Sequence, residues 1–276
     1  MHLKKLGLTL IAGLAFIALP TQATWLYGTQ GGNDNLIRID SVTGAIENVG
    51  LLPAGSNSAQ DPVQGLTGRA DGTLLYTDNT LDGVHVLNPT DGGLITTLAL
   101  PVTGRGGLSF DTPTNLLFSV TDLGTVVAQL GLGGPIAPLP FPLNPVFPGA
   151  LGGDDQGRHF VSAFDPTGLA AIYEIDPVSG FPINALGDFF PFEMSGLAFD
   201  GSFLYATNLI EPFIYTLDPN TGAVVSAAMF DGLPITSLAF LPAQDGGDGE
   251  VPAPATLALL ALGLIGIRQV KRKAIA

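Results

Sequence analysis

A four-strand unit that recurs along the chain limits its fold more than any other feature. The clearest copy spans Ser195–Asp231 and reads as four short β-strands joined by turns. Its first hairpin turn is Asp200-Gly201, which is expected to supply the two positive-φ residues of a tight hairpin. Its last turn, Asp218-Pro-Asn-Thr-Gly222, combines an Asp that bonds its own backbone with a Pro that fixes φ and a left-handed Gly. One such sheet cannot bury both faces alone, so copies must stack.

Three landmarks of this unit recur at a steady spacing. The first strands carry leucines 41 to 46 residues apart, at Leu66, Leu108, Leu151, Leu197 and Leu238. The second strands carry the aromatic residues Tyr27, Tyr76, Phe118, Phe160 and Tyr205. The last turns are Asp40–Gly44, Asn88–Gly92, Asp176–Gly180 and Asp218–Gly222. A period of about 40–45 residues with four strands per unit is typical of a β-propeller blade.

The two ends of the repeat region complement each other. The first copy begins at a second strand, Trp25–Gln30, and the last copy consists only of a first strand, Ile235–Leu241. Joining them would complete one blade and remove an exposed sheet edge. The sequence therefore predicts an all-β fold, a five-bladed propeller over residues 24–243 that is closed by pairing of its N- and C-terminal strands.

This architecture gives the propeller two unlike faces. The turns between first and second strands and between third and fourth strands are tight and share one face, here called the turn face. The longer connections share the other, here called the loop face, where binding sites usually lie. The most unusual connection is Gly131–Ala150, which holds six prolines. Because proline cannot donate a ladder bond, this segment predicts a short or absent fourth strand. It is either a recognition loop or an inert insertion in a degenerate blade.

The best repeat also resembles a known family. Leu204-Tyr-Ala-Thr-Asn208, followed by a strand and an Asp-Pro-x-Thr-Gly turn, is similar to the YVTN-type propeller repeats of bacterial and archaeal surface proteins. Leu75-Tyr-Thr-Asp-Asn79 is a second, poorer match. The resemblance implies a propeller and says little about function.

The N-terminal segment reads as an export signal. Residues 1–23 combine a basic start, an apolar run over Leu6–Leu19 and a small-residue cleavage site at Thr21-Gln-Ala23. The alternative is an N-terminal membrane-spanning helix. The chain has no cysteine, so an exported domain must be stable without disulfides.

The C-terminal segment combines three features in a fixed order. After a Gly/Asp linker at 244–250 come a proline-containing box, an apolar run to Ile267 and a basic end. The residues that carry this pattern are Val251, Pro252, Ala253, Pro254, Arg268, Lys271, Arg272 and Lys273. The pattern over 251–276 resembles the PEP-CTERM sorting signal, with Ala253 where that family has Glu. The resemblance implies a transmembrane helix, an exosortase-type membrane transpeptidase as partner, and a Gram-negative host. The alternative is an uncut membrane anchor.

Acidic and basic residues are distributed unevenly along the chain. All 24 acidic residues lie between Asp34 and Glu250, where the basic residues are four arginines, so this region carries a net charge of −20. Such a field repels phosphate backbones and makes nucleic acid a poor partner. Divalent cations and neutral or cationic glycans are compatible with it.

The ends of the second strands suggest a metal site. Asp78, Asp122, Asp165 and Asn208 follow these strands and would converge near the mouth of the central channel. Rings of carboxylate and amide oxygens can hold calcium. The alternative is that Asp and Asn are simply good strand-end and turn residues. Calcium is the one cofactor this pattern suggests.

Catalytic motifs are absent from the sequence. The two histidines of the propeller, His85 and His159, are expected on strand surfaces rather than in a catalytic role. We therefore expect a non-enzymatic, exported binding or structural protein of the cell surface or matrix, associated with exopolysaccharide in a biofilm and with extracellular polysaccharide or a surface protein as its partner. A calcium-dependent hydrolase of the lactonase-like propeller type is the alternative, because it would need none of the usual motifs.

Overall fold

The computed structural model describes the part of the chain that holds the repeat. The described residues are 23–53, 64–78, 83–98, 105–121, 126–130, 136–138, 144–145, 150–154, 157–164, 170–179, 181–190 and 194–242. They all belong to one compact unit, Ala23–Gly247. Residues 1–22 of the predicted signal segment, Asp122, Asp165 and every residue of the sorting segment lie outside them. Within these stretches, no helix has the length and apolar character that crossing a membrane requires.

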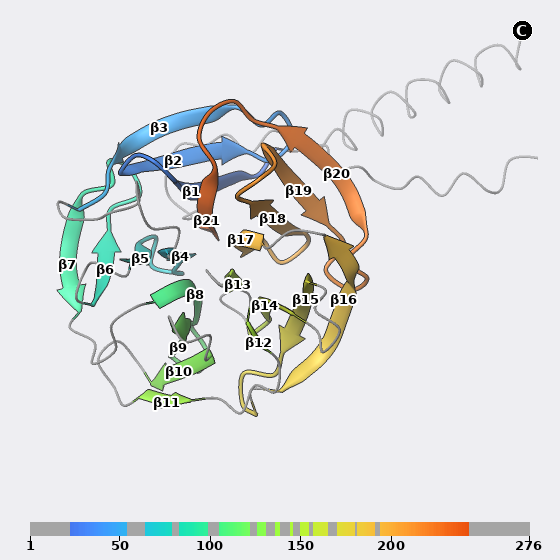
Figure 1. The fold of residues 1–276 in the computed structure, drawn as a ribbon. Coiled ribbons are helices and arrows are strands. Elements are labelled where there is room, and N and C mark those ends of the chain that lie inside the picture. The colour runs from blue at the N-terminus through green and yellow to red at the C-terminus, as the bar shows by residue number, and fades with distance from the viewer. Residues whose placement is uncertain are drawn as a thin grey trace, which may run out of the picture. The chain divides into compact units, whose positions relative to one another are not determined.

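The described residues form antiparallel β-sheets arranged around a common centre (Figure 1). Their strands are β1 (Trp25–Gln30), β2 (Asn35–Asp40), β3 (Ile46–Leu51), β4 (Gln64–Gly68), β5 (Leu74–Asp78), β6 (Val84–Leu87), β7 (Leu94–Leu98), β8 (Arg105–Asp111), β9 (Leu116–Thr121), β10 (Val126–Leu130), β11 (Ile136–Pro138), β12 (Asn144–Pro145), β13 (Leu151–Gly153), β14 (His159–Phe164), β15 (Ala170–Ile175), β16 (Pro182–Phe190), β17 (Met194–Phe199), β18 (Leu204–Asn208), β19 (Phe213–Leu217), β20 (Val224–Met229) and β21 (Ile235–Phe240). The sheet orders are β21-β1-β2-β3, β4-β5-β6-β7, β8-β9-β10-β11, β12-β14-β15-β16 with β13 also on β14, and β17-β18-β19-β20.

Four of these sheets repeat the regular four-stranded blade, and the sheet of β12–β16 departs from it. Its inner edge is divided, because β13 pairs with one end of β14 and β12 pairs with the other. In the preceding sheet the fourth strand, β11, has three residues. The short strand predicted for the proline-rich segment is therefore confirmed, and the regular blade predicted for every repeat is found four times.

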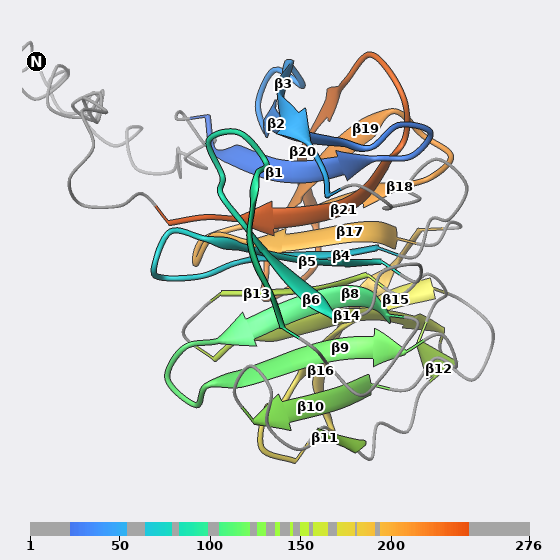
Figure 2. The same ribbon diagram turned by 90° about the vertical axis from the view of Figure 1, so that its left-hand side faces the viewer.

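The propeller-like ring is closed by the two ends of the repeat region, as the sequence predicts. β1 pairs antiparallel with β21, so that Leu26 lies opposite Phe240 and Gly28 opposite Leu238. The inner strands contact one another in the cyclic order β21, β4, β8, β13, β17 and back to β21. Figure 2 shows one sheet from the side, with β8, β9, β10 and β11 adjacent in that order. Closure pairs the inner edge of β1 with β21, so that β1 does not end the first sheet.

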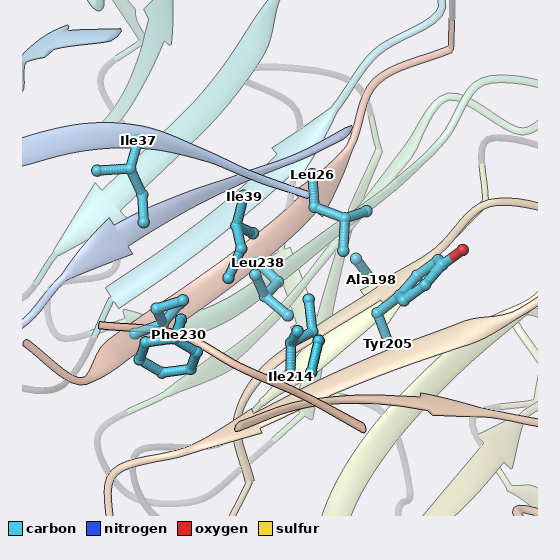
Figure 3. Close-up of a cluster of buried hydrophobic side chains, with 10 residues drawn as sticks. Leu26, Ile37, Ile39, Ala198, Tyr205, Ile214, Phe230 and Leu238 are labelled. Atoms are coloured by element: carbon cyan, nitrogen blue, oxygen red, sulfur yellow. The ribbon is translucent and has the colours of Figure 1, made fainter. Parts of the chain in front are cut away.

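The core lies between neighbouring sheets. The five repeated leucines of the inner strands are at most 2% exposed, and Tyr76, Phe118, Phe160 and Tyr205 are at most 1% exposed. Between the closing sheet and the β17–β20 sheet, Leu26 and Leu238 pack against Tyr205 (Figure 3). Burying each such side chain contributes roughly 1.5–3 kcal/mol, so the sequence landmarks are the residues that hold the sheets together.

The tight turns form as predicted at the third-to-fourth strand connections. Gly44, Gly92 and Gly222 all have φ between +71° and +73°. The Asp218 carboxylate accepts the backbone N–H of Asn220 at 2.8 Å, and the first residues of the other copies do the same. Gly180, in the fourth copy, lies outside the described residues.

The Asp200-Gly201 hairpin corrects one expectation. Among the two residues only Gly201 has positive φ, at +89°. Asp200 acts through its carboxylate instead, which accepts the N–H groups of Ser202 at 2.8 Å and Phe203 at 2.7 Å. The side chain thus stabilises a turn that needs only one left-handed residue.

These turns also join neighbouring sheets. A Cβ added at Gly44 would overlap the carbonyl oxygen of Met229, at the end of the preceding sheet's outer strand. In the same way, a Cβ on Gly50 would overlap the carbonyl oxygen of Asp91, in the turn of the following sheet. Gly44 therefore has two reasons to lack a side chain: its positive φ and its close contact with the adjacent sheet.

Candidate functional site

Two of the four predicted calcium ligands lie at equivalent positions in the described fold. Asp78 is the last residue of β5 and Asn208 is the last residue of β18. Across the described stretches, no three His, Cys, Asp or Glu side chains are grouped so that they could hold a metal ion. The calcium site therefore stays a prediction.

The side chain of Asn208 is engaged in its own loop. It is fully buried, and its Oδ1 accepts the backbone N–H of Ile210 at 2.8 Å and of Glu211 at 2.6 Å. Its Nδ2 donates to Glu211 Oε2 at 3.3 Å. This arrangement matches the alternative weighed above, in which an amide at a strand end caps the following turn.

Buried hydroxyl groups gather where the inner strands begin, near the loop face. Thr29 Oγ1 lies 2.6 Å from Ser237 Oγ and 2.8 Å from Thr236 Oγ1. Thr236 in turn lies 2.9 Å from Oε1 of Gln64, whose Nε2 is buried with no hydrogen-bond partner. The network joins β1, β21 and β4. Sequence analysis missed it, because these residues belong to no motif and come together only when the ring closes.

Both histidines are buried, so the expectation that they lie on strand surfaces is wrong. His85 is 6% exposed and His159 is fully buried. His159 packs on Phe118 with ring centroids 4.4 Å apart, and its Nδ1 lies 2.7 Å from Ser109 Oγ. Burial lowers the pKa of His159 to about 4, against the opposing charges of Asp111 and Asp154. A buried Ser–His pair of this kind has no access to substrate, so it supports the sheets rather than catalysis.

Three arginines lie near the turn face, and each meets a carboxylate and an aromatic ring. Arg38 pairs with Glu47 over Trp25, and Arg69 pairs with Asp71 over Phe110.

Arg158 extends this pattern across two sheets. Its Nε lies 2.8 Å from Glu174 Oε1, and its Nη2 donates to the Pro219 carbonyl at 3.1 Å. Its guanidinium lies 5.1 Å from the ring centroids of Phe160 and Phe199. The side chains of Arg38, Arg69 and Arg158 thus stabilise the turn face.

A second polar group lies on the loop face beside Asn208. The carboxylate of Glu211 accepts the phenol proton of Tyr215, and Tyr215 contacts Phe213 with ring centroids 6.0 Å apart. Burial, together with the hydrogen bond and charge of Glu211, raises the pKa of Tyr215 to about 12. Sequence analysis missed Glu211 as well. The only available signal was the short loop Asn208–Pro212, with a carboxylate three residues after the strand-end amide.

The segment after the ring matches a known sorting motif. β21 completes the ring at Phe240, and residues 250–273 then match the family model described as the PEP-CTERM protein-sorting motif. The chain is a β-propeller that carries a PEP-CTERM sorting motif. The motif implies recognition by an exosortase-type transpeptidase, export and a transient membrane anchor, as the residue pattern predicts.

Two solved structures are similar to this chain. The crystal structure of a nidogen–laminin complex aligns over 78% of this chain and 97% of that chain, with a TM-score of 0.51 and 12% identity. The crystal structure of Myxococcus xanthus glutaminyl cyclase aligns over 76% of each chain, with a TM-score of 0.47 and 15% identity. Among curated proteins, none matches this chain. At such identities the first likeness shows the propeller fold alone, and the YVTN-type detail stays a prediction.

Proposed function

We propose that this PEP-CTERM propeller is exported, sorted by an exosortase-type transpeptidase, and retained at the cell surface or in an exopolysaccharide matrix as a binding or structural protein. The observation that supports this most strongly is the sorting motif, which begins ten positions after the last strand of the ring. We count the irregular β12–β16 sheet as a blade, which gives a five-bladed propeller.

The geometry of the ring supports a binding role for the loop face. β1 begins beside the end of β21, with Leu26 opposite Phe240, so both ends of the propeller leave from the turn face. The loop face therefore carries neither connection to the flanking segments. Its connections differ in length and sequence from one repeat to the next, which is typical of a surface adapted to a partner. The net charge of −20 disfavours polyanions as that partner.

We further propose that the role is non-enzymatic and needs no cofactor. The chain has no cysteine nucleophile, and both propeller histidines are buried. Among the described residues, no observation favours the calcium-dependent hydrolase over a binding role.

The sorting step is tested by the fate of the C-terminus in cells that encode an exosortase. Fractionation and mass spectrometry should find the propeller outside the inner membrane without residues of the motif. The Ala253→Glu variant, which restores the Glu of the family's box, should increase the processed fraction. A deletion of residues 250–276 is the matched control and should be exported without any membrane-bound stage. Wild-type protein that stays full-length in the inner membrane would contradict the proposal.

A further inference from the structure

An exposed apolar surface lies on one side of the outer half of the β17–β20 sheet. Phe213 and Tyr215 on β19 lie directly opposite Met229 and Ala227 on β20. Opposite residues of an antiparallel pair point to the same side, so these four side chains form one surface, here called the aromatic patch. Met229 is 61% exposed, Ala227 is exposed, and both rings are partly exposed. The alternate residues of the same strands, such as Ile214, are buried against the closing sheet.

A carboxylate is fixed at the edge of this patch. Glu211 Oε2 is held by the Tyr215 phenol and by Asn208 Nδ2. The loop that carries Glu211 is fixed in turn by the two backbone N–H groups that Asn208 Oδ1 accepts. Glu211 Oε1 makes no hydrogen bond within the described part of the chain. The result is a pre-organised acceptor beside two aromatic rings, because its position does not depend on a ligand.

The chemistry of this surface selects among ligands. Aromatic rings offer a flat apolar surface for C–H groups, and an ionised carboxylate is a strong acceptor for hydroxyl protons. A neutral sugar presents both kinds of group on one ring. A polyanion is repelled by the net charge of −20, and Arg38, Arg69 and Arg158 are held near the turn face in ion pairs.

We propose that the aromatic patch, with Glu211 at its edge, binds the units of a neutral polysaccharide. Phe213 and Tyr215 supply the stacking surface, and Glu211 Oε1 accepts a sugar hydroxyl. Asn208 is a positioning residue that holds the Glu211 loop. This inference rests on the proposed function and deepens it, because it names a ligand class for a surface that begins at the loop-face end of β19 and β20.

The test is affinity electrophoresis of the full-length chain, purified in mild detergent, through gels that contain a soluble polysaccharide. Neutral glucans and galactomannans are the probes, and polygalacturonate is the anionic counterpart. We expect at least one neutral polymer to retard the wild-type protein and the anionic polymer to leave it unchanged. Glu211→Gln should weaken the neutral interaction about tenfold, since it removes a charged acceptor. Phe213→Ala should weaken it by a similar factor.

The matched control is Val178→Ala, which removes an 84% exposed apolar side chain from the β15–β16 turn and should bind as wild type. Thermal unfolding of each variant checks that the ring is intact, and Glu211→Gln keeps the test decisive where Phe213→Ala fails to fold. The proposal is overturned if no neutral polymer retards the wild type or if both patch variants bind normally. Preferential binding of a basic peptide that also requires Phe213 would assign the patch to a protein partner and likewise overturn it. None of these outcomes affects the cellular sorting test.

Discussion

The two faces of the propeller are built by different rules. On the turn face, one short motif is used four times: its Asp or Asn caps the turn in each copy, its Gly is left-handed in the three copies where that residue is described, and Gly44 and Gly92 lie close to a neighbouring sheet. On the loop face, the described contacts are not copies of one motif. They are a hydroxyl network around Thr29 and a carboxylate held beside Tyr215. The difference separates stability from recognition. Repeated turns fix the ring, and the face without repeats is free to carry a specific surface.

The largest expected effect comes from a turn glycine that also contacts a neighbouring sheet. Gly44→Ala should reduce the free energy of unfolding by about 3–5 kcal/mol, because it combines a strained φ with overlap of the Met229 backbone. Gly201→Ala is the matched control, since Gly201 has φ +89° but no atom within 4 Å of the added Cβ. That variant should lose only about 1 kcal/mol. Chemical denaturation of both proteins gives the comparison, and equal losses would show that the turns do not join the sheets.

A second prediction concerns the buried histidine at the turn-face end of β14. The pKa of His159 falls from 6.5 to about 4 on folding. The unfolded chain therefore takes up this proton first, and stability that is present above pH 6.5 is lost as the pH falls toward 4. The loss should reach about 3 kcal/mol. The free energy of unfolding of wild type and His159→Phe, measured across this range, isolates the effect. Parallel curves for the two proteins would mean that His159 titrates normally in the fold.

A smaller effect is expected from the arginine that joins two sheets. Arg158→Ala should lower the free energy of unfolding by about 2 kcal/mol. It removes a bidentate ion pair with Glu174, a hydrogen bond to the Pro219 carbonyl and stacking on two aromatic rings. Arg38→Ala should cost less than about 1 kcal/mol, since the Arg38–Glu47 pair is largely exposed. Thermal unfolding compares the two variants. A larger drop in melting temperature for Arg38→Ala than for Arg158→Ala would contradict the role assigned to Arg158.

The smallest effect is predicted for calcium on the loop face. Millimolar calcium should leave the melting temperature unchanged, because Asn208 Oδ1 already accepts two backbone N–H groups. A ligand that bound only the folded state would raise it by mass action. The measurement is thermal unfolding with and without calcium, with magnesium as the control. A calcium-specific rise would support the predicted metal site at Asp78, Asp122, Asp165 and Asn208, and with it the hydrolase alternative.

The sequence predicted those parts of the fold that repeat. The inner leucines and the second-strand aromatics are needed for burial between sheets, and the turn glycines are needed for a left-handed φ. Because each requirement recurs from repeat to repeat, the spacing of these residues predicts the sheets and the closing pair of strands. The irregular sheet was not foreseen, because the division of its inner edge between β12 and β13 depends on pairing rather than on a motif. The burial of His159 was missed for a similar reason, since Phe118 and Ser109 approach it from another sheet.

The candidate site was harder to predict than the fold. A strand-end Asn is compatible with a metal ligand and with a turn cap, and only its hydrogen bonds to Ile210 and Glu211 distinguish these roles. Glu211 and Tyr215 become a pair because the loop between β18 and β19 folds back on β19. The sorting motif, by contrast, is read from a linear segment, and sequence alone was sufficient to find it.

The most direct test of this account is a disulfide across the closing strands. Thr29 and Ser237 lie opposite each other on β1 and β21 with hydroxyl oxygens 2.6 Å apart, and the chain contains no other cysteine to compete. In the Thr29→Cys/Ser237→Cys variant we predict spontaneous formation of an intramolecular disulfide and a higher unfolding midpoint than in the reduced protein. The Thr97→Cys/Ser237→Cys variant should stay reduced. Failure of residues 29 and 237 to cross-link under oxidising conditions would contradict closure of the ring by its two ends.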